Sequence, residues 1–594
     1  MRQPRLRRTF ATAVAGVVVL ASCSSGDGAG RAAQERPPST ERTAAPAVDL
    51  RSASLSAAGR TMAAESGLDD APRYDLDAVI EPETGEVTAT MTAEVPAPSG
   101  AEPLRFRVFP NLPALDAGFR LSYVVVDGEA VAPVLDRSIL TLAPSRSAER
   151  VRVEMAFSYT VPVTDVATNP LAALGGDALD PAEIGLLGRH EGGLSLGHWF
   201  PVWLPPGTAS EPEPDGFGDI GNFPAATFAA RIEVPAPWQV FTGGTTTDRR
   251  YGGGRVTYLE EGVGLRDLSV YAGIDVTTTE VDVDGVTVRV VGRPGHAEVV
   301  PEVAEESAAA LSVLAGAFGP YPWSELDVLD VPLGSGVGGM EWPGVVWIET
   351  ATFGGGIPGL GALEGLDGLL GGDSGLAELF GGGALGSLRE SIVAHEVAHQ
   401  WWHALVGNDS IAAPVVDEPL AQFSACHYFR VTVPAEGDEL CAFHTEGQYQ
   451  MLRSLGEPDA PANQATDQFS SSLQYGAVVY GKAPGLYEEL RQLVGDEALL
   501  SALRAYVESH RFAVATPEDL RAALRAAGTA GGHEEAVDAL WVRWMEQAHG
   551  DEDIGAASPL GGLDGLEGLR GTGPGEEGDL EELLEELLEG LGEQ

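Results

Sequence analysis

Short stretches of strand-like sequence dominate the chain between residues 71 and 297. Segments such as 86–92 and 283–290 carry β-branched residues with turn residues between them. This spacing is typical of strands that pack one face on a core. No sustained helical period competes with it before Glu302. The pattern predicts an N-terminal β domain over 71–297, built as a β-sandwich or saddle.

The pattern changes after residue 301. The new elements are a helix at 302–318, strand-like segments at 325–332 and 338–349, and long helices from 388 to about 549. This order predicts an α/β lobe followed by a mainly helical lobe, which together span 298–549. Because 594 residues exceed one ordinary domain, we expect a multidomain α+β protein.

Two segments of low complexity accompany these lobes. Residues 354–386 are rich in glycine and leucine, and we expect a loose insertion there. Residues 550–594 form an acidic tail, in which leucines recur at helical spacing: Leu580, Leu583, Leu584, Leu587, Leu588 and Leu591. Such an apolar face could dock on a partner or on the protein itself, or the tail could be solvated and partly disordered.

The first 23 residues have the features of a lipoprotein signal peptide. Four arginines precede the apolar run 11–21, and Leu20-Ala21-Ser22-Cys23 resembles a bacterial lipobox. We expect cleavage before Cys23, a lipid on that cysteine, and an extracytoplasmic protein anchored to the bacterial cell membrane. An ordinary secretory signal with a chance cysteine is the alternative. Residues 24–70 are rich in Ala, Ser, Thr, Arg and Pro, which predicts a flexible linker.

The charge of the chain excludes one class of partner. A net charge of -52, from 88 acidic and 36 basic residues, argues against nucleic acid. Lys482 is the only lysine, which suggests a position where arginine will not serve. The sequence gives no signature of an oligomeric state.

Two cysteines lie in the body of the chain. Cys426 and Cys441 fall on two predicted helices joined by a short turn. In an oxidising compartment we expect a disulfide between them, which stabilises by roughly 3 kcal/mol. Two buried thiols are the alternative.

His395-Glu396-Val397-Ala398-His399 is an HExxH motif. Histidines four apart share a helix face, with about 5–6 Å between Cβ atoms, so both rings can reach one metal ion. Ser387 and Glu390 predict a capping box at the start of this helix. Glu418 follows His399 after eighteen residues, where a second predicted helix begins. Two histidines and one glutamate leave an open position for water, which predicts one catalytic zinc ion per chain.

These residues resemble the aminopeptidase N family of gluzincins, whose signature is HExxH, eighteen residues and then Glu. Three further segments are similar to family motifs in the same order: Gly338-Gly339-Met340-Glu341-Trp342, His399-Gln400-Trp401-Trp402 and Val479-Tyr480-Gly481-Lys482. The likeness covers about 320–490 and extends more weakly to Gly197-His198-Trp199-Phe200-Pro201. The family's large C-terminal helical domain has no counterpart in the sequence after Lys482.

The resemblance implies a thermolysin-like catalytic lobe that hydrolyses peptide bonds. Glu396 would be the general base, and Tyr480 would donate a hydrogen bond to the oxyanion. The segment 338–341 (Gly338, Gly339, Met340 and Glu341) would bind an extended peptide, with Glu341 on the substrate's free α-amine. Trp342 departs from the pattern, because the family has Asn there.

Three functions follow with different force. An aminopeptidase that trims peptides outside the cell fits every motif. An endopeptidase or another hydrolase on the same scaffold is the alternative, because fold and metal do not determine the substrate. A non-catalytic binding lipoprotein fits less well, because the expected ligands and general base are all present. His403, one turn after His399, is expected to be a packing residue, and Tyr475 could either line the site or belong to the core.

Overall fold

The computed structural model describes residues 52–98, 102–143, 149–164, 184–206, 221, 223–334, 337–356 and 387–558. All of them belong to one compact unit, Glu41–Gln594. The predicted signal peptide with Cys23, residues 24–51 of the predicted linker, most of the glycine-rich insertion and the leucine-bearing tail lie outside the described residues. Within the described ranges, no helix combines the length and apolar character needed to cross a membrane.

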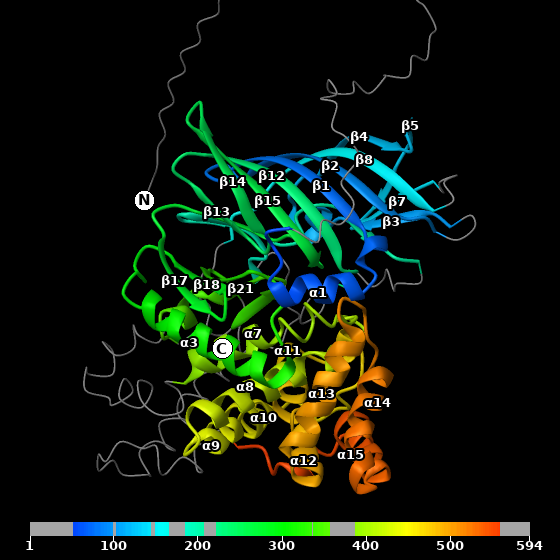
Figure 1. Ribbon diagram of the computed structural model, residues 1–594, viewed down its shortest axis with the longest axis vertical. Coiled ribbons are helices and arrows are strands. Elements are labelled where there is room, and N and C mark those ends of the chain that lie inside the picture. The colour runs from blue at the N-terminus through cyan, green and yellow to red at the C-terminus, as the bar shows by residue number, and fades with distance from the viewer. Residues whose placement is uncertain are drawn as a thin grey trace, which may run out of the picture. The chain divides into compact units, whose positions relative to one another are not determined.

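The N-terminal β domain consists of three sheets, which are blue to green in the upper half of Figure 1. The largest has the order β14 (Thr245–Gly252), β15 (Arg255–Leu265), β12 (Ala226–Pro235), β1 (Arg73–Glu81), β2 (Glu86–Pro96), β8 (Arg150–Thr160), β4 (Arg120–Val126) and β5 (Glu129–Ala130). One small sheet contains β13 (Gln239–Thr242), β16 (Val270–Gly273), β10 (Gly193–Leu196) and β9 (Leu187–His190). The other contains β11 (Val202–Leu204), β3 (Leu104–Arg107), β7 (Ile139–Leu142) and β6 (Val134–Asp136). Strict alternation of buried and partly exposed residues along β1 and β8 places one face of the large sheet on the core.

The second lobe is built on a five-stranded sheet. Its order is β17 (Thr277–Val283), β18 (Val286–Gly292), β19 (Glu325–Val331), β21 (Val345–Glu349) and β20 (Gly339–Trp342). Helix α3 (Val300–Phe318) connects β18 to β19, which pair in parallel, and β20 is an antiparallel edge strand. The predicted domain boundary after residue 297 is therefore wrong, because β17 and β18 belong to this sheet. A strand pattern does not reveal which sheet a strand joins.

Helices make up the rest of the second lobe. They are α4 (Thr350–Phe353), α7 (Leu388–Ala398), α8 (Glu418–Thr432), α9 (Gly437–Ala442), α10 (Gln448–Ser454), α11 (Ser472–Tyr475), α12 (Gly485–Val494), α13 (Asp496–His510), α14 (Pro517–Ala527), α15 (Glu534–Met545) and α16 (Gly550–Asp553). Two π-helical segments, Phe443–Gly447 and Gly476–Lys482, continue α9 and α11. The predicted fold class, a β domain followed by an α/β lobe and a helical lobe, is confirmed.

The segment 52–66 is ordered, so the predicted flexible linker ends too late. It contains helix α1 (Ala57–Glu65), capped by Ser56, whose Oγ accepts a hydrogen bond from Gly59 N. Figure 1 shows α1 lying between the β domain and the helices of the second lobe. Gly59 packs so closely on Pro322 O that a Cβ would lie 1.7 Å from it. Further contacts are Ser52 Oγ to Glu261 Oε2 at 3.0 Å and Arg511 Nη2 to Glu65 Oε2 at 2.6 Å. We call residues 52–66 the N-terminal brace.

The predicted acidic tail begins too early. Asp551 accepts a hydrogen bond from the Tyr449 hydroxyl at 2.8 Å and an ion pair from Arg453. Gly550 N donates to Asp459 Oδ2 at 2.8 Å, and Ser558 N donates to Gln450 O at 3.0 Å. The folded lobe therefore extends to residue 558.

Arg266, between β15 and β16, ties the β domain to the second lobe. Its guanidinium is buried and donates to five main-chain carbonyls, those of Phe223, His403, Ala404, Leu405 and Ala513. Burial lowers the pKa of Arg266 to about 9. Five fixed donors match five carbonyl oxygens, so the group is satisfied without a carboxylate. The joint holds the loop after α7 against the β domain.

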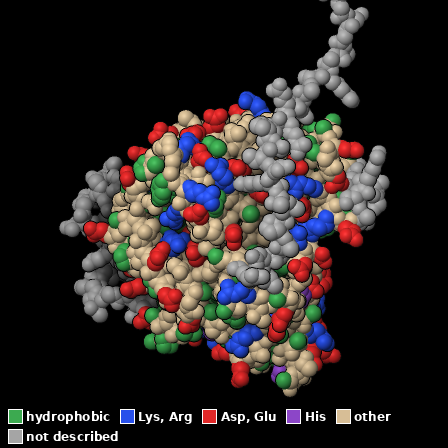
Figure 2. Space-filling view, turned by 45° about the horizontal axis from the view of Figure 1, so that its top comes forward, with side chains coloured by type: hydrophobic (Ala, Val, Ile, Leu, Met, Phe, Trp, Pro, Cys, Tyr) green, Lys and Arg blue, Asp and Glu red, His purple; other side chains and the backbone are tan. Residues whose placement is uncertain are grey.

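Charged side chains on the large sheet are arranged in pairs. Arg255 binds Glu81 and Glu233 at 2.7 Å each, and Arg231 binds Asp77 at 2.9 Å. Figure 2 shows basic side chains lying among acidic ones on the face it presents. Partly exposed pairs of this kind contribute about 0–1 kcal/mol each.

Candidate active site

Helix α7 carries His395 and Glu396, and His399 forms its C-terminal cap. The predicted capping box is wrong, because neither of its side chains caps this helix. Ser387 Oγ lies 2.8 Å from His444 Nε2, and Glu390 Oε1 accepts a hydrogen bond from Tyr428. Both side chains bind neighbouring helical segments, which a one-helix pattern cannot reveal.

The structure brings His395, His399 and Glu418 together. All three are buried, and Glu418 is the first residue of α8. The two histidine Nε2 atoms are 3.1 Å apart, and each lies 3.3 Å from Glu418 Oε2. Four ligands about 2.0–2.1 Å from a tetrahedral zinc ion lie about 3.3 Å from one another. The three atoms therefore have the spacing of one face of such a site.

The hydrogen bonds of the two histidines also fit a metal. His395 Nδ1 faces Gln422 Oε1 at 3.1 Å, and His399 Nδ1 faces Trp402 O at 2.9 Å. Both oxygens can only accept, so each Nδ1 carries the proton and each Nε2 presents a lone pair. Two lone pairs and a carboxylate oxygen at this distance repel one another unless a cation lies between them. The donor set fits zinc.

Glu396 lies between the metal ligands and strand β20. Burial raises the pKa of Glu396 to about 8, with His399 opposing the rise and Glu418 adding to it. A Cβ on Gly339 would lie 2.5 Å from the Glu396 carboxylate carbon, so only glycine leaves room for that side chain. Glu341 is two residues along β20 and therefore on the same face. Ligand atoms of Glu341, Glu396 and His399 lie within 4.8 Å of one another.

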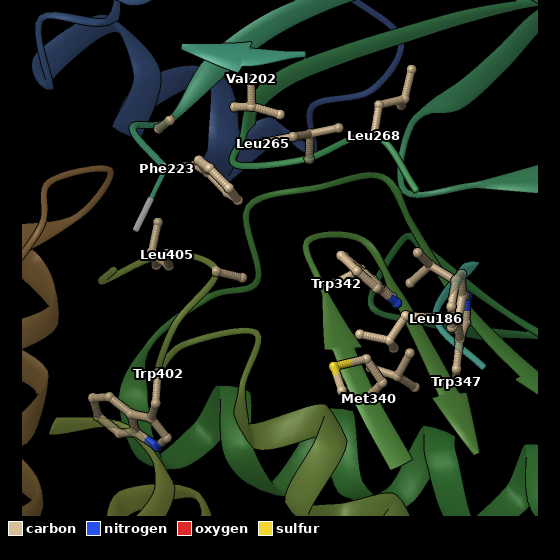
Figure 3. Close-up of a cluster of buried hydrophobic side chains, with 14 of the residues drawn as sticks. Leu186, Val202, Phe223, Leu265, Leu268, Met340, Trp342, Trp347, Trp402 and Leu405 are labelled. Carbon is tan, nitrogen blue, oxygen red and sulfur yellow. The ribbon is translucent and has the colours of Figure 1, made fainter. Parts of the chain in front are cut away.

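The opposite face of β20 belongs to the core. Figure 3 shows Met340 and Trp342 together with Leu186 and Trp347 in a buried cluster. The Trp342 ring centroid lies 5.1 Å from that of Trp347 and 4.9 Å from that of His198. The side chain of Met340 is thus placed in the core, away from Glu341, which corrects its predicted role in substrate binding. Trp342 faces away from Glu341 for the same reason. Gly338 O accepts a hydrogen bond from Glu349 N at 3.0 Å.

Tyr480 lies beside the metal ligands. Its ring centroid is 5.7 Å from that of His395 and 5.7 Å from that of Tyr475. Burial raises the pKa of Tyr480 well above its ordinary value, and Glu418 adds to the rise. The hydroxyl therefore keeps its proton and can donate it in a hydrogen bond.

Lys482 points away from this site although it is two residues from Tyr480. Its ammonium donates to Asp459 Oδ1 at 2.8 Å, to Gln547 O at 3.2 Å and to Ala460 O. A compact ammonium offers three donors around one point, which the planar fork of arginine does not. The only lysine thus joins three segments of the helical lobe.

Residues 387–544 match the Peptidase family M1 domain. This part of the chain is a peptidase family M1 domain. Aminopeptidase N of Lactococcus lactis subsp. lactis is 32% identical over 168 residues, covering 26% of this chain and 18% of that one. Aminopeptidase M1 of Arabidopsis thaliana is 24% identical over 329 residues, covering 54% and 34%. The chain thus spans about a fifth to a third of the length of these relatives.

A solved structure shares the fold over a larger part of the chain. The M1 zinc metallopeptidase from Deinococcus radiodurans superimposes with a TM-score of 0.54 and 20% identity. The match covers 83% of this chain and 95% of that one. It includes residues well outside 387–544, so the β domain and the M1 domain occur together in both folds.

Two features of the M1 domain escaped the sequence analysis. Gln422 holds His395, and its signal was its place one turn after Glu418, on the same helix face. His403 lies near Glu341 and Asp417, with ligand atoms of the three within 4.8 Å of one another. His403 has a φ of 103°, which side chains rarely adopt, and only the three-dimensional structure reveals this. Asp417 caps α8 and accepts a hydrogen bond from Glu418 N at 3.0 Å.

Proposed function

We propose that the protein is a zinc-dependent aminopeptidase that acts outside the cell. One observation carries the proposal: two carboxylates, Glu396 and Glu341, lie on the same side of the zinc ligands, within 4.8 Å of His399. One of them can serve as a base at the scissile bond. The other can bind a positive charge one residue away. A protease that only cuts within chains has no need for the second.

The chemistry follows from these positions. A zinc ion on His395, His399 and Glu418 would supply a Lewis acid and an acidified water. Glu396 takes a proton from the attacking water and delivers it to the leaving amine. Tyr480 donates a hydrogen bond to the carbonyl oxygen as negative charge develops there.

Strand β20 is suited to hold the peptide. It is the last strand of its sheet and pairs with β21 on one side, so its other edge can accept an extended chain. Glu341 would pair with the substrate's α-ammonium and hold the first residue beside the zinc. In support, a mutant of the Deinococcus enzyme was solved with a Tyr-Ser-Ala substrate, and another with L-tryptophan.

The location is part of the proposal. The signal features of residues 1–23 favour export and a lipid on Cys23. A disulfide joins Cys426 and Cys441, which supports an oxidising compartment. Peptides outside the membrane would be the substrates.

The test compares peptides with free and with acetylated amino termini. Wild-type protein should release the first residue of the free peptide and leave the acetylated one intact. Glu341→Gln should lower kcat/KM on the free peptide by at least about tenfold, because a charge-assisted contact contributes about 1.5–3 kcal/mol. Zinc content should not change.

Glu349→Gln is a matched control on the neighbouring strand. Its carboxylate accepts hydrogen bonds from Ala351 N and Thr352 N, so it serves α4 and not the substrate. It should leave the preference for free amino termini unchanged. Internal cuts in an acetylated peptide, at the rate of the free one, would overturn the aminopeptidase proposal and favour an endopeptidase.

A further inference from the structure

A chain of contacts leads from the zinc ligand His395 to the disulfide. His395 Nδ1 lies 3.1 Å from Gln422 Oε1, and Gln422 Nε2 donates to His444 O at 3.0 Å. His444 Nε2 in turn lies 2.8 Å from Ser387 Oγ, at the start of the helix that carries His395. Gln422 and Ser387 are both buried, as is His444. The contacts therefore form a closed, water-free loop around the first zinc ligand.

The identity of each partner determines where the protons lie. A main-chain carbonyl can only accept, so His444 O requires the amide nitrogen of Gln422 on its side. The amide oxygen then faces His395, and it too can only accept. His395 must therefore carry its proton on Nδ1, which leaves the Nε2 lone pair for zinc. A residue without this donor and acceptor pair would not select that tautomer.

The disulfide braces this contact on both sides. Cys426 lies one turn after Gln422 on α8, and Cys441 lies on α9, three residues before His444. The bond thus links the two helical segments one turn away from the Gln422–His444 hydrogen bond. Thr445 Oγ1 also donates to Cys441 O at 2.8 Å, which fixes the turn that presents His444 O. With the bond absent, α8 and the 443–447 segment could separate.

We propose that Gln422 is a positioning residue that sets zinc affinity by holding His395 in its metal-binding tautomer, and that the Cys426–Cys441 disulfide maintains this hold. The chain therefore reaches its full zinc affinity only after the disulfide has formed, in the oxidising compartment where the enzyme works. The inference rests on the zinc site of the proposed function, but not on any peptide substrate.

The first test measures zinc affinity by competition with a chelator. Gln422→Met keeps the length of the side chain and removes the acceptor, so zinc affinity should fall by about 10–100-fold. Gln422→Glu keeps an acceptor for His395 and should remain close to wild type. An unchanged affinity in Gln422→Met, or an equal loss in Gln422→Glu, would overturn the proposal. The absorption spectrum of the cobalt-substituted protein should change in Gln422→Met and not in Gln422→Glu.

A matched control separates positioning from folding. Gln474 is also a buried glutamine of the same lobe, which donates to Pro458 O at 2.8 Å and accepts from Ser470 N at 2.7 Å. Gln474→Met should lower thermal stability and leave zinc affinity unchanged. A comparable loss of zinc affinity in Gln474→Met would show a general effect of destabilisation, and would overturn the assignment to Gln422.

The second test addresses the disulfide. Replacing both cysteines with serine (Cys426→Ser, Cys441→Ser) should weaken zinc binding in the wild-type background. In the Gln422→Met background the same replacement should add little, because both changes act on one contact. Full additivity, or no effect in either background, would overturn the role of the disulfide. Since no peptide enters these assays, a protein that binds zinc as expected but cleaves nothing would contradict the proposed function and leave this inference standing.

Discussion

Two groups of buried carboxylates in this molecule are compensated in different ways. Where the β domain meets the second lobe, Glu260 accepts hydrogen bonds from Thr242 and Thr246 at 3.0 and 2.8 Å. Nearby, Asp327 pairs with Arg289 at 2.8 Å. At the active site Glu396, Glu418 and Asp417 are equally buried. Their charged neighbours of opposite sign, among the described residues, are histidines.

The difference shows what each group is for. A buried charge is costly unless a partner compensates it. The group at the domain junction is compensated by the protein itself, through hydroxyls, an arginine and bound protons. Burial raises the pKa of Glu260 and of Asp327 to about 7. The active-site group lacks such partners, so cations from outside, zinc and a substrate ammonium, have to supply the compensation.

The largest expected effect is at Glu396. Glu396→Gln removes the base without changing the shape of the side chain, so kcat should fall by about 10²–10⁴ or more while zinc stays bound. His399→Ala should instead lose zinc and activity together. Metal analysis and peptide hydrolysis check both variants. If Glu396→Gln remained active, another group would be the base.

Tyr480→Phe should have the next largest effect. The ring is kept and the oxyanion loses one donor, which lowers kcat by about 10²–10³ with little change in KM. Steady-state kinetics on a free peptide measure this. A variant with nearly wild-type kcat would assign the role to another residue, and Tyr475 is the nearest tyrosine.

A pH experiment tests the junction group. The pKa of Glu260 rises from 4.5 to about 7 on folding, so the folded state keeps a proton that the unfolded chain loses. The free energy of unfolding should therefore fall as pH rises from about 4.5 to 7, and level off above. Glu260→Gln cannot ionise. Relative to wild type it should gain nothing at pH 4.5 and up to about 3 kcal/mol at pH 8. Denaturant midpoints at both pH values measure this, and an equal shift at both would contradict it.

The smallest effect is expected from the tail. Truncation after Ser558 removes many acidic residues but neither buried group, so activity and melting temperature should stay unchanged. Truncation after His549 removes Asp551 and Asp553 and their ion pairs with Arg453 and Arg543. That variant should melt at a lower temperature. A large drop on the shorter truncation would show that the leucine stripe docks on the folded lobe.

The parts of the site that could be predicted depend on local spacing. His395 and His399 meet because they are four apart on a helix, and Gly339 and Glu341 share a face because they are two apart on a strand. The same alternation puts Met340 and Trp342 in the core, which strand geometry alone would have allowed us to state. The fold class followed from the change of period near residue 301.

The parts that could not be predicted depend on distant neighbours. Arg266 is one arginine among many until five carbonyls surround it. Ser387 and Glu390 look like a capping box until His444 and Tyr428 bind them. Helix α1 has a short alanine-rich sequence, and its position comes from the groups on which it packs. In each case tertiary contacts override a local preference.

The N-terminal brace has a consequence for the order of folding. Glu65 binds Arg511, 446 residues later, and Ser52 binds Glu261, 209 residues later. The earliest described segment to be synthesised therefore finds its last partner only when most of the chain has emerged. Contacts between such distant residues form slowly, because a long loop has to close. A molecule tethered through its N-terminal residues would also transmit any pull on the tether to the brace first, and the junction of its domains would bear that load.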